Sequence, residues 1–183
     1  CKRPNTFYDC AAVHVELAEP FCPVMRQWLL NTAKTKLADY NVHEKGTYVV
    51  MEGPAFSTKA ESHMHRAWGG DLIGMTCMPE AKLAREAELA YALIGLPTDY
   101  DCWREHDPNV DQMDLLTEII GNLKKASAAG IELIKAALSD VELLLTTPSP
   151  AHQALKLGIW SNKDNIDKQE IERLGVLWGM YFQ

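Results

Sequence analysis

The apolar positions of the chain form short runs, each closed by glycine, proline or a polar cluster. Runs of this kind lie at 47–52, 72–75 and 90–97, and their length and boundaries predict three β-strands. Helical patterns separate them, and strand–helix–strand units of this length favour parallel strands with right-handed crossovers. The pattern therefore predicts an α/β fold with an open, twisted, mostly parallel sheet flanked by helices.

Helix-start signals follow the first two predicted strands. Thr58 with Glu61 three residues later fits a capping box, and Pro79 suits the first position of a helix rich in Ala, Leu, Glu, Lys and Arg. Asp111 is placed to cap a long helix, which Gly121 and Gly130 should weaken. Periodicity and boundary residues predict further helices over 23–36, 111–138 and 168–179.

A polar or aromatic cluster follows each predicted strand, where open α/β sheets present their ligand sites. The predicted crevice is lined by Phe56, Ser57, Met75, Thr76, Asp99 and Asp101. An aromatic face with a thioether suits a flat or apolar ligand, while hydroxyls and carboxylates offer directional hydrogen bonds. The set contains no Arg or Lys, so an anionic group on the ligand would need partners from elsewhere.

The same residues also fit purely structural roles. Phe56 and Met75, taken singly, are typical core residues, and Ser57 or Thr76 is a typical helix cap. An Asp-x-Asp sequence in a loop is usually a turn or helix-start signal. Because these residues fall together at successive strand ends, their joint placement favours a site, and the structural interpretation stays open beside it.

Composition and charge limit the classes of function. The 183 residues are 47% apolar, which is ample for one domain spanning 1–183, and the net charge of −7 without a basic run argues against a nucleic-acid surface. No apolar stretch is long enough to span a bilayer, and His63 and His65 are too close in sequence to share a helix face as metal ligands. An odd number of cysteines without C-x-x-C indicates reduced thiols and a cytoplasmic protein: Cys1, Cys10, Cys22, Cys77 and Cys102.

Several ordered stretches carry a family resemblance. The run EGPAFSTKAES at 52–62, followed by WGGDLIGMT at 68–76, resembles the trimeric purine nucleoside phosphorylase superfamily. The stretches MPEAKLARE and TDYDCW, together with His14 and AEPFCP upstream, are similar more narrowly to its 5′-methylthioadenosine phosphorylase branch. The resemblance covers roughly the first two thirds of the chain, and its compatible motif spacing makes it specific.

The resemblance implies roles for the residues of the predicted crevice. Phe56 would pack on the ribose and base, Ser57 would lie near the base edge, and Met75 and Thr76 would touch ribose and phosphate. Leu115 would border the methylthio pocket, although its helical spacing equally fits a core residue.

Specificity would rest on the carboxylates. Asp99 would face the purine ring nitrogen N7, and Asp101 the exocyclic amine. Relatives that act on 6-oxopurines carry glutamate in place of Ser57 and asparagine in place of Asp99, so this chain points to adenine. A hydrogen-bond mismatch of this kind can discriminate by about 10⁴ because a buried partner is left unpaired.

The implied reaction is phosphorolysis of 5′-methylthioadenosine, with inorganic phosphate as co-substrate and no metal or organic cofactor. A protonated Asp99 could supply a proton to N7 as adenine leaves, with Asp101 as its anionic neighbour. His14 would reach the ribose pocket of a neighbouring subunit, which implies a homotrimer.

The family's glycine-rich phosphate turn and Arg-His pair do not occur in this sequence. We therefore expect the chain to correspond to the C-terminal portion of the family domain and to be inactive alone. Three alternatives stay open: a 6-oxopurine nucleoside phosphorylase, a non-catalytic nucleoside-binding fragment, and a metal-dependent nucleoside hydrolase that would use the two carboxylates as ligands.

Overall fold

The computed structural model describes residues 3–105 and 109–183. The chain divides into two compact units, which are described separately below. The first unit comprises Trp28–Met75 and Ile94–Val141, and the second unit comprises 3–27, Thr76–Leu93 and Glu142–Gln183. The prediction of one domain over 1–183 stays a prediction.

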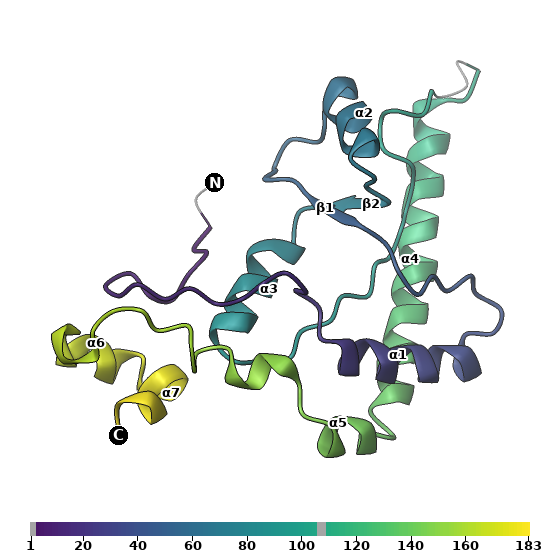
Figure 1. Ribbon diagram of the computed structural model, residues 1–183. Helices are drawn as coiled ribbons and strands as arrows, with labels where there is room; N and C mark the ends of the chain where they lie inside the picture. The colour runs from purple at the N-terminus through teal and green to yellow at the C-terminus, as the bar shows by residue number, and fades with distance from the viewer. Residues whose placement is uncertain (1–2, 106–108) are drawn as a thin grey trace. The chain divides into compact units, whose positions relative to one another are not determined.

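The helices and strands of the described residues follow one another along the chain (Figure 1). They are α1 (Pro23–Lys36), β1 (Tyr48–Val50), α2 (Lys59–Ala67), β2 (Leu72–Gly74), α3 (Cys77–Glu86), α4 (Gln112–Ala137), α5 (Glu142–Thr146), α6 (Lys168–Arg173) and α7 (Gly175–Trp178), with short 3₁₀ helices at Pro150–Gln153, Lys163–Asn165 and Gly179–Phe182.

In the first unit, β1 and β2 form a parallel pair joined through α2. The register places Tyr48 opposite Leu72 and Val50 opposite Gly74. Gly74 leaves room for the Tyr48 side chain, because a Cβ at this glycine would overlap the Tyr48 hydroxyl. The first two predicted strands and their parallel direction are therefore confirmed.

The predicted third strand at 90–97 is wrong. The structure assigns no strand there, and β1 and β2 make the only sheet among the described residues. The Tyr91 carbonyl accepts a 2.7 Å bond from the Cys22 N–H instead of from a neighbouring strand, and Ile94 packs against helices. Apolar composition alone does not make a strand, since a strand also needs a partner for its backbone groups.

The helix after β1 begins as its sequence predicts. The Thr58 hydroxyl accepts from the Glu61 N–H, and the Glu61 carboxylate accepts from the Thr58 N–H at 2.7 Å, so both halves of the capping box are present. In α3, Met78 has non-helical dihedrals, so continuous helix begins at Pro79, the predicted first position.

The core of the first unit lies between α1 and α4. Ala33 and Leu37 pack with Ala129 and Leu133, and Leu29 and Ile94 complete the cluster. The Asp111 side chain caps α4 by accepting from the Met113 N–H, as predicted. The helix continues through Gly121 and Gly130 without a break, because packing of its apolar face outweighs the intrinsic cost of glycine.

A second apolar stripe runs along α4 and stays exposed among the described residues. Its members recur at spacings of three and four residues or their sums, which places them on one side of the helix. They are Met113, Leu116, Ile120, Leu123, Ile131, Ile134 and Leu138.

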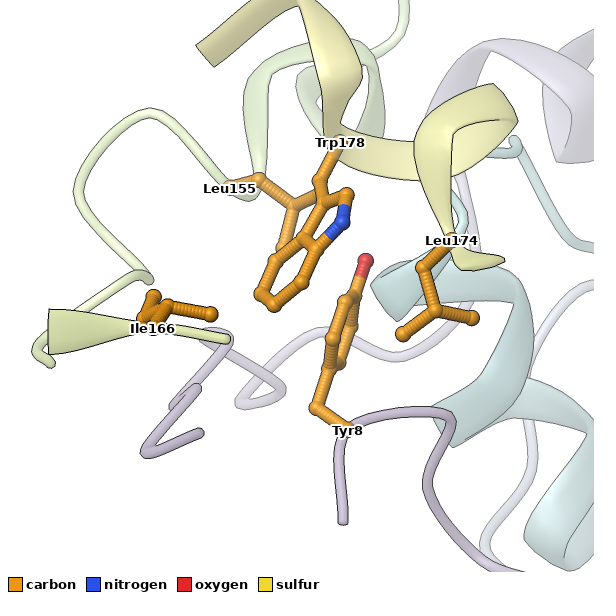
Figure 2. Close-up of a cluster of buried hydrophobic side chains, with 5 residues drawn as sticks. All are labelled: Tyr8, Leu155, Ile166, Leu174 and Trp178. Atoms are coloured by element: carbon orange, nitrogen blue, oxygen red, sulfur yellow. The ribbon is translucent and has the colours of Figure 1, made fainter. Parts of the chain in front are cut away.

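The core of the second unit is built mainly from residues near the C-terminus (Figure 2). Tyr8, Leu155, Ile166, Leu174 and Trp178 converge in it, and the rings of Tyr8 and Trp178 lie 4.8 Å apart between centres. The single helix predicted over 168–179 is wrong, because it breaks at Leu174, whose φ of −103° and ψ of 16° are not helical. Leu174, at this break, and Trp178, four residues later, are both buried in the core.

No helix among the described residues has the length and apolar character needed to cross a membrane.

Candidate functional site

The turn after β1 approaches the end of β2. Gly53 has a φ of 67°, a backbone conformation that favours glycine, and a Cβ there would lie 2.7 Å from the Met75 sulfur. Beyond this turn Phe56 is 86% exposed, so the interpretation of Phe56 as a core residue is wrong. The turn thus presents an aromatic side chain to solvent and holds Met75 beside its backbone.

Ser57 connects this turn to the loop at 98–105. Its carbonyl oxygen accepts from the Cys102 thiol at 3.3 Å, and its hydroxyl points to the Met51 sulfur at 3.7 Å. Ser57 does not cap α2, because Thr58 holds that position. Two of the predicted strand-end clusters therefore meet, even though the third strand is absent.

The two predicted carboxylates lie within the 98–105 loop. Asp99 is exposed, and its Oδ1 accepts from the Thr98 hydroxyl at 2.5 Å. Asp101 is half-buried, and its Oδ1 accepts from the Cys102 N–H at 2.9 Å, which is the local turn role that an Asp-x-Asp sequence also indicated. The loop is tied to α4 through Asn122, whose side-chain nitrogen donates to the Thr98 carbonyl at 2.9 Å.

Sequence reasoning missed a set of stacked side chains around this loop. The Arg66 guanidinium lies 3.5 Å from the centre of the Trp103 ring, and the Trp103 and Tyr100 rings meet nearly at right angles with centres 5.8 Å apart. The Arg104 guanidinium lies 4.2 Å from the centre of the Tyr100 ring. The available signal was an arginine in the last turn of the helix together with two aromatic residues in the TDYDCW stretch.

Leu115 lies on α4 in the first unit. The apolar residues that follow it at i, i+4 spacing are Ile119 and Leu123. Leu115 and Ile119 are half-buried and Leu123 is exposed, so the core interpretation of this spacing holds only in part. The assignment of Leu115 to a methylthio pocket stays a prediction.

The two remaining predicted residues, Thr76 and His14, belong to the second unit. Thr76 is exposed at the start of α3 and makes no side-chain capping bond, so the cap interpretation does not hold for it. His14 is exposed, its N–H donates to the Gly158 carbonyl at 2.8 Å, and its ring meets Trp160 edge-on at 4.9 Å between centres.

A buried arginine holds the segment that follows His14. Arg85 donates to the Glu16 carboxylate at 2.9 Å and to the Glu16 and Glu19 carbonyls at 2.7 and 2.6 Å. Because Arg85 is buried, these bonds satisfy a charge that would otherwise be costly in the interior. The segment carrying His14 is therefore anchored to α3.

Cys77, directly after Thr76, is not equipped as a nucleophile. Burial, followed by the nearby Glu80 carboxylate, raises the pKa of the Cys77 thiol, which disfavours the reactive thiolate. Among residues 3–105 and 109–183, no three His, Cys, Asp or Glu side chains are grouped so that they could hold a metal ion.

The chemical capacity of the first-unit site follows from its members. Phe56 offers a flat apolar face, and Ser57, Asp99 and Asp101 offer hydrogen-bonding groups from two loops in contact. Such an arrangement suits a flat heterocycle with polar edges. The individual roles that the family resemblance implies stay predictions.

Comparison with curated proteins identifies relatives that share one name. The S-methyl-5′-thioadenosine phosphorylase of Prochlorococcus marinus is 40% identical, over 98% of this chain and 58% of the relative. The protein of that name from Synechocystis sp. is 43% identical, over 99% of this chain and 55% of the relative. The chain thus spans less than two thirds of the length of these relatives.

Solved structures with the same fold include two from the same group. A methylthioadenosine phosphorylase from an antarctic soil metagenomic library superposes with a TM-score of 0.83 at 39% identity, covering 97% of this chain and 61% of the other. The methylthioadenosine phosphorylase of Schistosoma mansoni, solved in complex with adenine, superposes with a TM-score of 0.71 at 29% identity. The match covers 87% of this chain and 62% of the other. The predicted α/β, nucleoside phosphorylase-like fold class is therefore confirmed.

The family model agrees with these relatives. It is described as the phosphorylase superfamily and matches residues 2–139, which contain every residue of the predicted site. The chain is therefore a member of the phosphorylase superfamily.

Proposed function

We propose that this chain provides the nucleoside-binding part of an S-methyl-5′-thioadenosine phosphorylase, a pentosyltransferase of methionine and purine salvage. Phosphate would attack the sugar carbon that carries the base, and the glycosidic bond would break to give adenine and 5-methylthioribose 1-phosphate. The shared name of the curated relatives and the ordered motifs support this substrate. Because the chain spans 58% and 55% of these two relatives, the activity is a proposal for the whole protein.

One contact carries the proposal. The Cys102 thiol bond to the Ser57 carbonyl brings the turn that exposes Phe56 next to the loop that holds Asp99 and Asp101. An aromatic face and two carboxylates from adjoining loops suit a purine, with Phe56 against the ring and the carboxylates at its polar edge.

In the proposed reaction the carboxyl groups of Asp99 and Asp101 have different roles. Adenine leaves more readily when N7 receives a proton as the bond breaks, and Asp99 in its protonated form would donate it. Asp101 would accept from the exocyclic amine. The developing positive charge on the sugar would be stabilised by the incoming phosphate, so the reaction requires no metal or organic cofactor.

We further propose that the protein assembles as a homotrimer. In a homotrimer the exposed His14 would serve the ribose pocket of a neighbouring subunit, and the Arg85 bonds to the following segment support a fixed position for it. The enzyme would act in the cytoplasm.

Chromatographic measurement of the adenine that the whole protein releases from methylthioadenosine tests the function. We expect release that requires phosphate, survives chelation of metals and is lost in Asp99→Ala, with inosine turned over poorly. Release that continues without phosphate would contradict phosphorolysis, and release abolished by chelation would favour a metal-dependent hydrolase.

A second candidate is nucleoside binding without turnover by this chain alone, which the coverage of 55% to 61% of the relatives favours. Calorimetry distinguishes it: binding of methylthioadenosine with no adenine release supports this candidate, whereas absence of both binding and release overturns both functions.

A further inference from the structure

The contact between Arg66 and Trp103 links α2 to the 98–105 loop. The Arg66 guanidinium lies 3.5 Å from the ring centre, which is well within the distance of a cation–π contact. Trp103 is half-buried, and it in turn braces Tyr100 edge-on at 5.8 Å. Four side chains thus contact one another in the order Arg66, Trp103, Tyr100, Arg104, with the two rings in the middle.

The two aromatic residues of the stack flank Asp101 in the chain. Tyr100 lies between Asp99 and Asp101 in the chain, and Trp103 follows Cys102, whose thiol bonds to the Ser57 carbonyl. The ring contacts therefore restrain the backbone on both sides of Asp101. A shift of Trp103 would move the loop relative to the turn that carries Phe56.

The other side-chain link between α2 and this loop is weaker. Lys59 and Glu105 form an ion pair at 3.2 Å, but both side chains are largely in solvent. Exposed ion pairs contribute little because water and salt screen them. Arg66 is exposed as well, but a planar guanidinium stacked on the half-buried Trp103 indole keeps its contact without a directed hydrogen bond. We therefore expect the Arg66–Trp103 contact to contribute more to the attachment than the Lys59–Glu105 ion pair.

The far end of α2 is also fixed. Its capping box holds the first turn directly after Ser57, so the helix joins the two loops as a rigid element. Arg66 sits in the last turn and reaches the 98–105 loop from there.

We propose that Arg66 and Trp103 are positioning residues that set the preference for adenine over 6-oxopurines by holding Asp99 and Asp101 against the turn after β1. This inference rests on the proposed nucleoside-binding function. Adenine carries an amine where a 6-oxopurine carries a carbonyl, and a carboxylate distinguishes the two only if it is held in a fixed place. If the carboxylate moves away, a water molecule bridges the gap and can satisfy either group, so the selectivity is lost. Neither residue touches the ligand in this assignment.

The test uses the full chain in four variants: Arg66→Ala, Trp103→Ala, Trp103→Phe and, as a matched control, Lys59→Ala. Lys59→Ala removes the same charge from the same helix. One readout is the alkylation rate of Cys102, resolved by peptide mass spectrometry, with the buried Cys77 as internal reference. The other is the ratio of affinities for adenine and hypoxanthine, measured by calorimetry.

We expect Arg66→Ala and Trp103→Ala to speed Cys102 alkylation roughly three- to tenfold and to lower the affinity ratio by a similar factor, with Cys77 unchanged. Trp103→Phe keeps an aromatic face, so its Cys102 alkylation rate and its affinity ratio should both stay close to those of the wild type. Lys59→Ala should match the wild type in both, and circular dichroism checks that each variant folds.

Wild-type alkylation and an unchanged affinity ratio in Arg66→Ala would overturn the proposal. Equal weakening of both bases with the ratio intact would show that the stack is only structural, and would overturn it as well. If the wild-type chain binds neither base, the proposed function fails, and the alkylation rates still decide whether the stack holds the loop.

Discussion

The thiol of Cys102 donates to the backbone carbonyl of Ser57 across 3.3 Å. This contact joins the turn after β1 to a loop that lies far away in the sequence. A thiol bond is weak by itself, so the contact matters as a marker of position rather than as a source of stability. It brings an aromatic face and two carboxylates into one region of the first unit.

Replacing Asp99 by Asn should shift base preference from adenine toward 6-oxopurines. Asparagine cannot supply a proton to N7, and its amide offers both a donor and an acceptor to the ring edge. Affinities of wild type and Asp99→Asn for adenine and hypoxanthine, measured by calorimetry, check this expectation. An unchanged ratio of the two affinities would count against the assignment of Asp99 to base recognition.

Gly53→Ala should destabilise the first unit and displace Met75. The φ of 67° costs a non-glycine residue roughly 1 kcal/mol, and the new Cβ would lie 2.7 Å from the Met75 sulfur. Urea unfolding should therefore show a loss of about 1–2 kcal/mol. Gly121→Ala is the control, because a Cβ there meets nothing within 4 Å and the position is helical, so it should be neutral or stabilising.

The capping box makes the start of α2 sensitive to acid. The Thr58 N–H bond, followed by the bond from its hydroxyl, lowers the pKa of the Glu61 carboxyl. A lowered folded-state pKa contributes stability above the unfolded value near 4.3, and this contribution is lost as the pH falls through the folded value. The protection factors of residues 59–67, which are exchange rates corrected for the slower intrinsic exchange in acid, should fall below about pH 4. Glu61→Gln, whose amide oxygen still accepts, should show a weaker pH dependence.

Truncation of two leucines of α4 to alanine should change the free energy of unfolding by very different amounts. Leu133 is 6% exposed in the core with Ala33 and Leu37, whereas Leu116 is 49% exposed. Leu133→Ala should lower the free energy of unfolding by about 2–5 kcal/mol, and Leu116→Ala by less than about 0.5 kcal/mol. Denaturant titration followed by fluorescence measures both, and similar losses would mean that the exposed stripe is covered in solution.

Alkaline pH should destabilise the second unit. Burial, followed by the 2.7 Å bond from its hydroxyl to Glu88, raises the pKa of Tyr181 to about 12. Because the unfolded value is near 10, this contribution is present below pH 10 and is lost as the pH rises toward 12. The unfolding midpoint should fall over that window. Burial also raises the pKa of Tyr8 in the same unit, so part of the fall should remain in Tyr181→Phe, which cannot ionise at position 181. A midpoint that falls just as steeply in this variant as in the wild type would contradict a contribution from Tyr181.

Local signals determined several elements correctly. Pro23 marks the start of α1, the Thr58 and Glu61 pair marks α2, and Asp111 marks α4. These features depend on neighbours within four residues, so their chemistry can be read without knowledge of the fold. The ordered motifs likewise identified the family, because their spacing is a property of the chain itself.

Tertiary structure alone decided the remaining features. The segment at 90–97 has the composition of a strand but no partner for a ladder, and the last predicted helix is interrupted at Leu174, whose side chain is buried in the core. The stack of Arg66 on Trp103 joins residues whose proximity no local pattern encodes. Sequence determines what each segment prefers locally, whereas burial and long-range pairing select among those preferences, because their free energy depends on which distant residues meet.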